Sequence, residues 1–331
     1  MGRRSVWSDP EVRIFSERFF PVADEVWRLQ RGNDAECKTF QAMADGGHYR
    51  GAGTTRQGIY VCTPAGTRLA SVNANDPKRV LATLREGWRA WEALPQEERW
   101  IRSADHLRPA HRWEQSFPDA GLVLESACRD LVAERTADER WNRDHVWFHG
   151  DEVALWLPPR QADEPAAGFE WALPELVTLR LARLHLVDNV RGQSVPFARS
   201  EIEHAALSAR VESADEDRLE LSFRGATRAH APGPWQLEDT SFKPKSGREY
   251  VHGVETELIG RAVFDHAAAR FTAFELVAVG ERWGFTENNG RRNQAERSPV
   301  GFAFRLAPDT PAARVSPAFI QVYEADWVKR P

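Results

Sequence analysis

The sequence predicts an α+β protein made of two parts, and three observations carry that prediction. Over residues 1–95, segments with helical apolar spacing surround one short strand–turn–strand unit. The stretch 96–119 is charged and interrupted by prolines. Over 120–331, long segments alternate apolar and polar side chains. We therefore expect an α/β module, then a linker or wrapping segment, and then an α+β domain whose mainly antiparallel sheet could curl toward a barrel.

Capping signals place three helices in the first part. Ser8 opens an S-x-x-E capping box in front of an apolar stripe, with a proline near the first turn. Asp34 is the expected N-cap of a helix over DAECKTFQAMAD, which a glycine pair ends. Asp76, followed by proline, starts the third helix. Its apolar residues recur at helical spacing: Val80, Leu81, Leu84, Trp88 and Trp91.

The strands of the first part follow from β-rich runs and turn residues. IYVC and TRLAS flank TPAG, a turn in which proline comes before glycine, so they predict a hairpin. FFPVADEVW is expected to be extended, because Pro21 disfavours the helical conformation at Phe20.

Hairpins dominate the second part. GLVLESACRDLV and HVWF predict strands, Asp151 is the expected N-cap of a short helix in GDEVALWLPP, and ALPELVTLRLARLHLVDNV predicts a longer amphipathic helix. AALSARVESADEDRLELSFRGATRA alternates on both sides of an acidic turn, and a longer hairpin over 252–284 turns near residues 266–269. VGFAFRL and AFIQVYEADW add two candidate strands.

The order of signals over residues 8–94 resembles the thioredoxin-like superfamily: a D-P-E-V helix, an F-F-P-V strand, a polar helix, the hairpin IYVCTPAGTRLAS and a D-P-x-x-V helix. The resemblance implies a sheet with a CxxC pair and a facing cis-proline. Here MGRRSVW occupies the place of the CxxC motif, the strand that carries the motif is missing, and the place of the proline falls on Arg56 or Gln57. We therefore expect a truncated, redox-silent module used for packing or partner recognition, with Arg56 and Gln57 as candidate binding residues.

The missing strand also suggests an occupant for the sheet edge. An exposed edge is normally covered, and either AFIQVY or a segment of a second copy of the chain is apolar enough to cover it. The partners expected from the sequence are thus a protein partner or a homodimer, besides a small-molecule ligand whose identity the sequence leaves open.

The three cysteines do not form a recognisable redox or zinc motif. Cys37, Cys62 and Cys128 are far apart, and their odd number disfavours a disulfide framework. Cys37 is the remaining candidate for a thiol oxidoreductase, because an early position in a helix favours the thiolate. Asp34, where a CxxC motif would begin, opposes it. The alternative is an ordinary helix cysteine, and the other two are expected to be core residues.

The histidines of WNRDHVWFHGDE are candidate ligands of a divalent transition metal. On a helix, His145 and His149 would share a face and could chelate one ion. In the extended conformation expected for HVWF, four residues span ~13 Å, too far for joint chelation. An individual catalytic role for His145 beside Trp147 stays open.

Acidic and basic residues further along supply the other candidates. His185 lies three residues before Asp188 on the predicted amphipathic helix, where a carboxylate could orient the imidazole, and Arg191 follows in the polar segment after it. Glu275 interrupts an apolar strand, so it is either paired with Arg261 or Arg282 or an acid, base or metal ligand in a cleft. The polar loop GERWGFTENNGRRNQ contributes candidate binding residues: Trp283, Asn288 and Arg291.

Composition excludes several classes of function. The net charge is −5, the pI is about 6.1, and basic residues are scattered, so nucleic-acid binding is not expected. No apolar run approaches the ~18 residues of a transmembrane helix, and no signal peptide is apparent, so a cytoplasmic location is the default expectation. The alternative is an exported protein whose signal has been removed, because its sequence would look the same.

Three functions remain open at the level of sequence. The first is a redox-silent scaffold or binding module whose ligand site lies in the second part. The second is a metal-assisted enzyme of unknown reaction that uses His145, His149, His185, Asp188 and Glu275. The third is a thiol oxidoreductase acting through Cys37.

Overall fold

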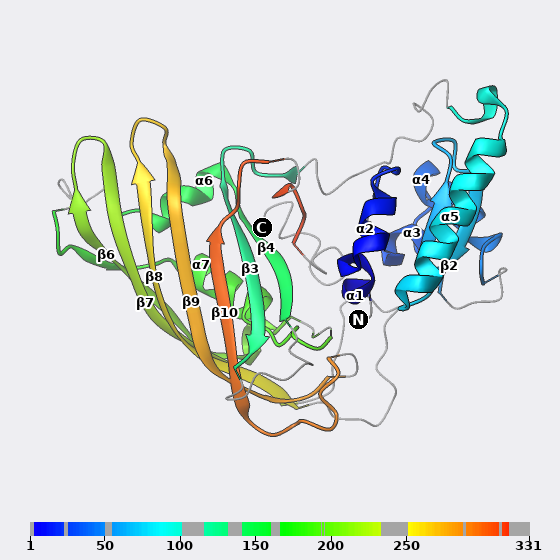
Figure 1. Cartoon of the computed structure of the whole chain (residues 1–331). Helices are drawn as coiled ribbons and strands as arrows, with labels where there is room; N and C mark the ends of the chain where they lie inside the picture. The colour runs from blue at the N-terminus through cyan, green and yellow to red at the C-terminus, as the bar shows by residue number, and fades with distance from the viewer. Residues whose placement is uncertain are drawn as a thin grey trace. The chain divides into compact units, whose positions relative to one another are not determined.

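The computed structural model divides the chain into two compact units, Met1–Arg112 and Trp113–Pro331 (Figure 1). The boundary falls within the charged stretch 96–119. The structure describes residues 3–22, 26–49, 55–100, 116–131, 141–159, 166–192, 194, 196–232, 251–286, 289–310 and 313–317.

The first unit contains short helices and one long helix. The bounds are α1 Arg3–Ser8, α2 Pro10–Ser16, α3 Val26–Arg31, α4 Ala35–Asp45, α5 Pro77–Ala93 and the 3₁₀ helix η1 Gln96–Glu98. Asp34 and Asp76 cap α4 and α5 as predicted, accepting the backbone N–H groups of Cys37 (2.8 Å) and Lys78 (3.1 Å). Each aspartate stands immediately before its helix, and its short side chain can reach the free N–H groups of the first turn.

The predicted N-cap of α2 is wrong by one residue. Ser8 ends α1, and the carboxylate of Asp9 accepts the backbone N–H groups of Glu11 (3.0 Å) and Val12 (3.1 Å). Because the residue before a proline favours extended backbone, Asp9 takes the conformation that an N-cap needs (φ −67°, ψ 127°).

The predicted hairpin is confirmed as an antiparallel pair, β1 Ile59–Cys62 and β2 Arg68–Val72. Gly66, at φ +84°, supplies the left-handed residue of its turn. FFPV does not form a strand in the described residues: Phe20 and Val22 are 99% and 83% exposed, and helix α3 follows. AFIQVY lies outside the described residues. Within the described part of this unit, the sheet has two strands, both from residues 1–95.

A small apolar core holds the first unit together. Helix α5 packs on both strands, and Gly87 permits close approach, since a Cβ there would lie 2.5 Å from a methyl of Val61. The core side chains are Val6, Val12, Val61, Ala70, Val72, Ala74, Val80, Leu81 and Leu84.

The second unit is built on one eight-stranded antiparallel sheet of order β4-β3-β10-β9-β8-β7-β6-β5 (Figure 1). The bounds are β3 Leu122–Asp130, β4 Trp141–Phe148, β5 Glu170–Ala172, β6 Ile202–Ala214, β7 Arg218–Ala231, β8 His252–Asp265, β9 Arg270–Gly284 and β10 Ser298–Leu306. Both predicted hairpins are confirmed as β6–β7 and β8–β9. The expected curling does not close a barrel: β4 and β5 remain at the two edges.

Short helical segments connect the strands. They are α6 Gly150–Val153, the 3₁₀ helix η4 Ala154–Trp156, α7 Glu175–Arg180, the π-helix η5 Leu181–His185 and the 3₁₀ helix η6 Arg199–Glu201. The N-cap of α6 is His149 rather than the predicted Asp151, because the Glu152 carboxylate accepts the His149 backbone N–H at 2.7 Å. The predicted amphipathic helix ends at His185, earlier than expected.

Aromatic side chains fill the inner face of the sheet. The Trp156 ring meets the rings of Phe148, Phe223 and Phe274 edge to face, with centroids 5.0–5.5 Å apart. Val177 of α7, Leu181 of η5 and Leu186, which follows η5, join the same core. A site for a polar ligand must therefore be sought at the margin of this core.

Candidate functional site

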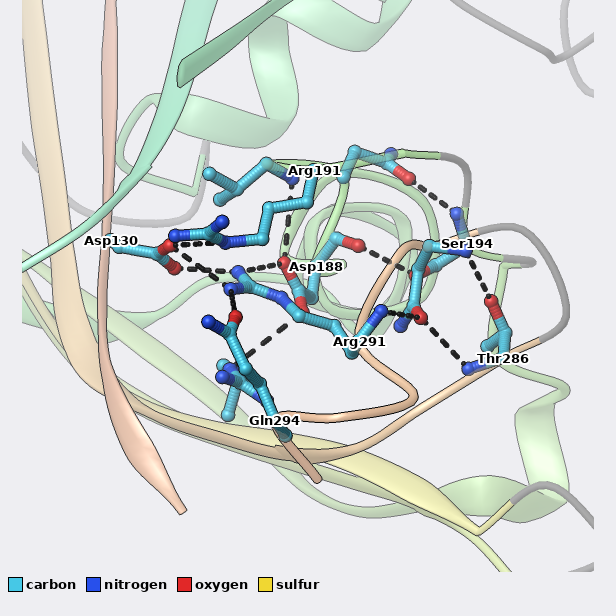
Figure 2. Close-up of polar contacts among 11 residues, drawn as sticks. Asp130, Asp188, Arg191, Ser194, Thr286, Arg291 and Gln294 are labelled. Carbon is cyan, nitrogen blue, oxygen red and sulfur yellow. Dashed lines mark hydrogen bonds and ion pairs between the residues drawn. The ribbon is translucent and has the colours of Figure 1, made fainter. Parts of the chain in front are cut away.

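Arg291 is the centre of a buried ionic cluster at one margin of the second unit (Figure 2). Its guanidinium donates to Asp130 through Nη1 (3.0 Å) and Nη2 (2.5 Å), and to Asp188 through Nε (2.8 Å) and Nη2 (2.9 Å). Nη1 also reaches the side chain of Gln294 at 3.3 Å. Arg291 is only 1% exposed, so both carboxylates act on it in a medium that screens charge weakly.

Three separate segments bring the cluster together. Asp130 is the last residue of β3, Asp188 follows the π-helix, and Arg291 lies in the loop between β9 and β10. Buried Asn289 shapes that loop, since its side-chain oxygen accepts the backbone N–H groups of Thr286 (3.0 Å) and Arg291 (3.2 Å). These bonds fix the direction in which Arg291 leaves the loop.

Two further arginines surround the same carboxylates. Arg191 Nε donates to Asp130 at 3.0 Å, and Arg282 Nε lies 3.9 Å from an oxygen of Asp188. Arg282 is 3% exposed, and its Nε has no hydrogen-bond partner. Three guanidinium groups against two carboxylates leave one positive charge in excess among these five residues, which we call the Arg291 cluster.

The pKa values of the cluster reflect this crowding. Burial raises the pKa of Asp130, but hydrogen bonds and charge from Arg291 and Arg191 outweigh it, so the net pKa is lowered. Burial and the neighbouring positive charge of Arg291 lower the pKa of Arg282. The pKa of Arg291 is raised despite its burial, because both carboxylates hold the proton in place.

A partly open hollow of about 480 Å³ adjoins the cluster and shares Arg191 with it. Its described lining residues are Arg191, Thr286, Gly290, Arg292, Asn293 and Gln294. None of these described lining residues is acidic, and most carry hydrogen-bond donors. Gly290, at φ +71°, turns the backbone at its wall. Exposed Arg292 makes no ion pair with any residue that the structure describes.

The hollow and the Arg291 cluster include three of the residues singled out from the sequence: Asp188, Arg191 and Arg291. Sequence reasoning did not single out Asp130 or Gln294, whereas Asn289 belongs to the polar loop that it did single out. Asp130 ends a strand that also carries Glu125 and Arg129, so its charge alone did not distinguish it as a site residue. Asn288 lies outside the described residues.

The predicted pairing of His185 with Asp188 is wrong. His185 Nδ1 lies 3.1 Å from Asp144 Oδ2 on β4, whereas Asp188 binds Arg291. His185 comes at the end of the π-helix, and Asp188 lies beyond it in non-helical backbone, so the two no longer share a helical face. The imidazole is buried beside the carboxylate of Asp144.

His145 and His149 are not brought together as metal ligands. His145 lies in β4, opposite Glu125 of β3, while His149 begins α6. Burial lowers the pKa of His145, and its Nε2 is buried without a hydrogen-bond partner. Trp147 is buried, and its indole N–H donates to the carbonyl of Val315 (3.1 Å). No group of three or more His, Cys, Asp or Glu side chains suited to a metal occurs in the described part of the chain.

Glu275 is an exposed residue on the outer face of the sheet. Arg261 Nε and Nη2 donate to its carboxylate at 2.9 and 2.7 Å, which is one of the two pairings that the sequence allowed. Trp283, a candidate binding residue in the sequence analysis, lies under the guanidinium of Arg297, whose central carbon is 4.2 Å from the centroid of the Trp283 ring. Neither residue lines the hollow.

The candidates of the first unit serve local structure. Arg56 forms a two-point ion pair with Asp45 (2.6 and 3.0 Å) and donates to the carbonyl of Gln30 (3.1 Å). Gln57 is exposed, and its carbonyl lies 3.2 Å from His48 Nε2.

Cys37 is completely buried, and its Sγ lies 3.4 Å from Asp34 Oδ2. A thiol in this position is shielded from solvent and faces a carboxylate. Both features oppose the accessible thiolate that disulfide exchange requires. Cys128 is buried as predicted, but the prediction that Cys62 is a core residue is wrong: Cys62 is exposed, because side chains alternate between faces along β1 and the preceding Val61 faces the core.

Comparison with protein-family models, with curated proteins and with solved structures found no match for this chain. In the part of the chain that the structure describes, none of the helices has the length and apolar character needed to cross a membrane.

Proposed function

We propose that this protein is a redox-silent binding protein whose second unit holds a small anionic ligand in the hollow beside the Arg291 cluster. One observation carries the proposal: three arginines share two buried carboxylates directly beside an open polar hollow. Arginine is the preferred side chain for carboxylates and phosphates, because its planar guanidinium donates two parallel hydrogen bonds.

The dimensions and chemistry of the hollow support a small-molecule ligand. Its volume of about 480 Å³ lies in the range of ligand pockets, roughly 300–1,000 Å³. Arg292 at the rim has no described carboxylate to neutralise it, and Asn293 and Gln294 add amide donors. The cluster beneath is held rigid from three segments, so the site would be formed before the ligand arrives.

The first unit would serve as a scaffold within this proposal. Its likeness to the thioredoxin-like superfamily rests on the sequence pattern, and the burial of Cys37 beside Asp34 supports a redox-silent role. The catalytic alternatives lack comparable support: the described residues bring together no metal-ligand set, and Glu275 is occupied on the outer face by Arg261.

Direct binding of sulfate to the full chain tests the proposal. We expect saturable binding by isothermal titration calorimetry at low ionic strength, and a loss of at least fivefold in affinity for Arg292→Gln. Arg292 is exposed and makes no described ion pair, so this variant should keep the parent unfolding temperature. Arg305→Gln, which removes a charge from the outer face, is the matched control and should bind as the parent does. The absence of binding to sulfate, phosphate and malonate, or equal losses in the two variants, would refute the proposed site.

A further inference from the structure

The charge distribution around the hollow indicates what kind of anion it suits, and this step rests on the proposed function. The Arg291 cluster carries one positive charge in excess, and Arg292 places a second at the rim. A ligand with a single negative charge would leave the described site with a positive charge uncompensated. A ligand with two negative charges would balance it.

The position of the donors favours one compact group over two separate ones. Arg191, Arg292, Asn293 and Gln294 line a single hollow, and Arg191 and Gln294 also touch the cluster, through Asp130 and Arg291 respectively. A tetrahedral group with three terminal oxygens can accept hydrogen bonds from several such donors at once. Two carboxylates joined by a carbon chain would need donors at two separated points.

The environment of Arg282 independently favours a negatively charged ligand in the hollow. Its side chain is 4% exposed, its Nε lacks a hydrogen-bond partner, and its Nη1 donates to the backbone carbonyl of Gln294, a residue of the hollow. A buried guanidinium with an unused donor is costly unless nearby negative charge compensates it. The nearest described carboxylate, that of Asp188, lies 3.9 Å from Arg282 Nε and is already bound by Arg291, so an anion in the hollow, beyond Gln294, would add to the negative charge around Arg282.

We infer that the ligand of the hollow carries a phosphate monoester and that the site takes this group as its dianion. Arg292 and Arg191 would face the phosphate oxygens, while Asp130 and Asp188 hold Arg291 and Arg282 in place beneath. The Asp130 and Asp188 carboxylates would thus be positioning residues, and Arg292 would contribute most to the difference in affinity between a dianion and a monoanion.

The dependence of binding on the charge of the ligand tests this inference. The second ionisation of a phosphate monoester has a pKa of about 6, so the dianion falls to roughly a tenth of the total at pH 5. Sulfate stays divalent over the whole range and reports any change in the protein itself, including the titration of Asp130, Asp188, Glu296 or other ionisable groups around the loop. We expect glycerol 2-phosphate to bind about tenfold more weakly at pH 5 than at pH 7.5, after correction by the sulfate data measured with the full chain.

The outcomes separate this inference from the proposed function. If glycerol 2-phosphate and sulfate keep a constant ratio of affinities from pH 7.5 to pH 5, the hollow binds anions without requiring two charges, and only the inference fails. If malonate binds tenfold more tightly than both, the site takes carboxylates, and again only the inference fails. If none of the three binds, both fail. Arg292→Lys, which keeps the charge but loses the two-point donor, should weaken glycerol 2-phosphate less than Arg292→Gln does.

Discussion

Arg180 and Arg291 are both buried arginines of the second unit, and they differ in how their charge is balanced. Arg180 meets one carboxylate, that of Glu152, at 3.0 and 2.6 Å, and also donates to the backbone carbonyl of Trp147. Its guanidinium carbon lies 4.8 Å from the centroid of the Phe148 ring. Among the described residues the two charges match one to one, and both side chains are largely buried.

Arg291, by contrast, belongs to a group in which arginines outnumber carboxylates and whose margin opens into a hollow. A matched, enclosed pair has no charge left for a ligand and serves to join β4, α6 and α7. An unmatched group beside a hollow retains positive charge where a solute can reach it. The contrast explains why we assign a structural role to the first arginine and a binding role to the second.

The largest effect is expected for Glu152→Gln. This change leaves the Arg180 guanidinium buried without its counter-charge, which typically costs about 3–5 kcal/mol of stability. Urea unfolding followed by tryptophan fluorescence measures the loss. The folded fraction should bind sulfate with unchanged affinity, since the pair does not contribute to the hollow. Glu275→Gln breaks an exposed pair of the same type and should cost no more than about 1 kcal/mol. Similar losses in the two variants would contradict the assigned role of burial.

Asp188→Asn should destabilise the protein and make its stability more dependent on anions. Removing one carboxylate leaves three arginines against Asp130, and a bound anion can then replace part of the missing charge. In differential scanning calorimetry, we expect 50 mM sulfate to raise the unfolding temperature more in this variant than in the parent. If sulfate raises the unfolding temperature of the variant no more than that of the parent, anion binding in the hollow does not compensate the charge of the cluster.

His145, which belongs to neither arginine site, is expected to make a smaller contribution to stability, and this contribution depends on pH. Burial lowers its pKa below the unfolded value of about 6.5, so the unfolded chain takes up a proton first as the pH falls. Stability from the neutral imidazole is therefore present above pH 6.5 and is lost as the pH falls through the folded pKa. His145→Gln should flatten the stability profile between pH 7 and pH 5. An unchanged slope would exclude His145 as its source.

Local signals in the sequence predict much of this fold. Asp34 and Asp76 cap their helices because a short carboxylate and the backbone beside it suffice for capping, and both long hairpins follow from alternation around an obvious turn. FFPV did not form a strand, because a strand needs hydrogen-bonding neighbours that a nine-residue window does not contain. The N-cap of α2 shifted to Asp9 because the adjacent proline selects the conformation of the residue before it.

The site was harder to predict than the fold. Asp188, Arg191 and Arg291 were each recognisable as polar residues at segment ends, but their association depends on three segments meeting at the margin of one sheet. Nothing near Asp188 in sequence indicates that its partner is Arg291 rather than His185. The place of Asp130 at the end of β3 acquires meaning only once the neighbouring loops are positioned.

The pair formed by Glu275 and Arg261 is part of a longer row of polar side chains on the outer face of the sheet. Across five adjacent strands, the residues in register are His145, Glu125, Arg305, Glu275 and Arg261. Sliding one strand by two residues would keep its apolar side chains facing the core but would remove its charge from this row. The row therefore penalises alignment errors that the hydrophobic core tolerates, so the sheet has a second, electrostatic determinant of strand alignment during folding.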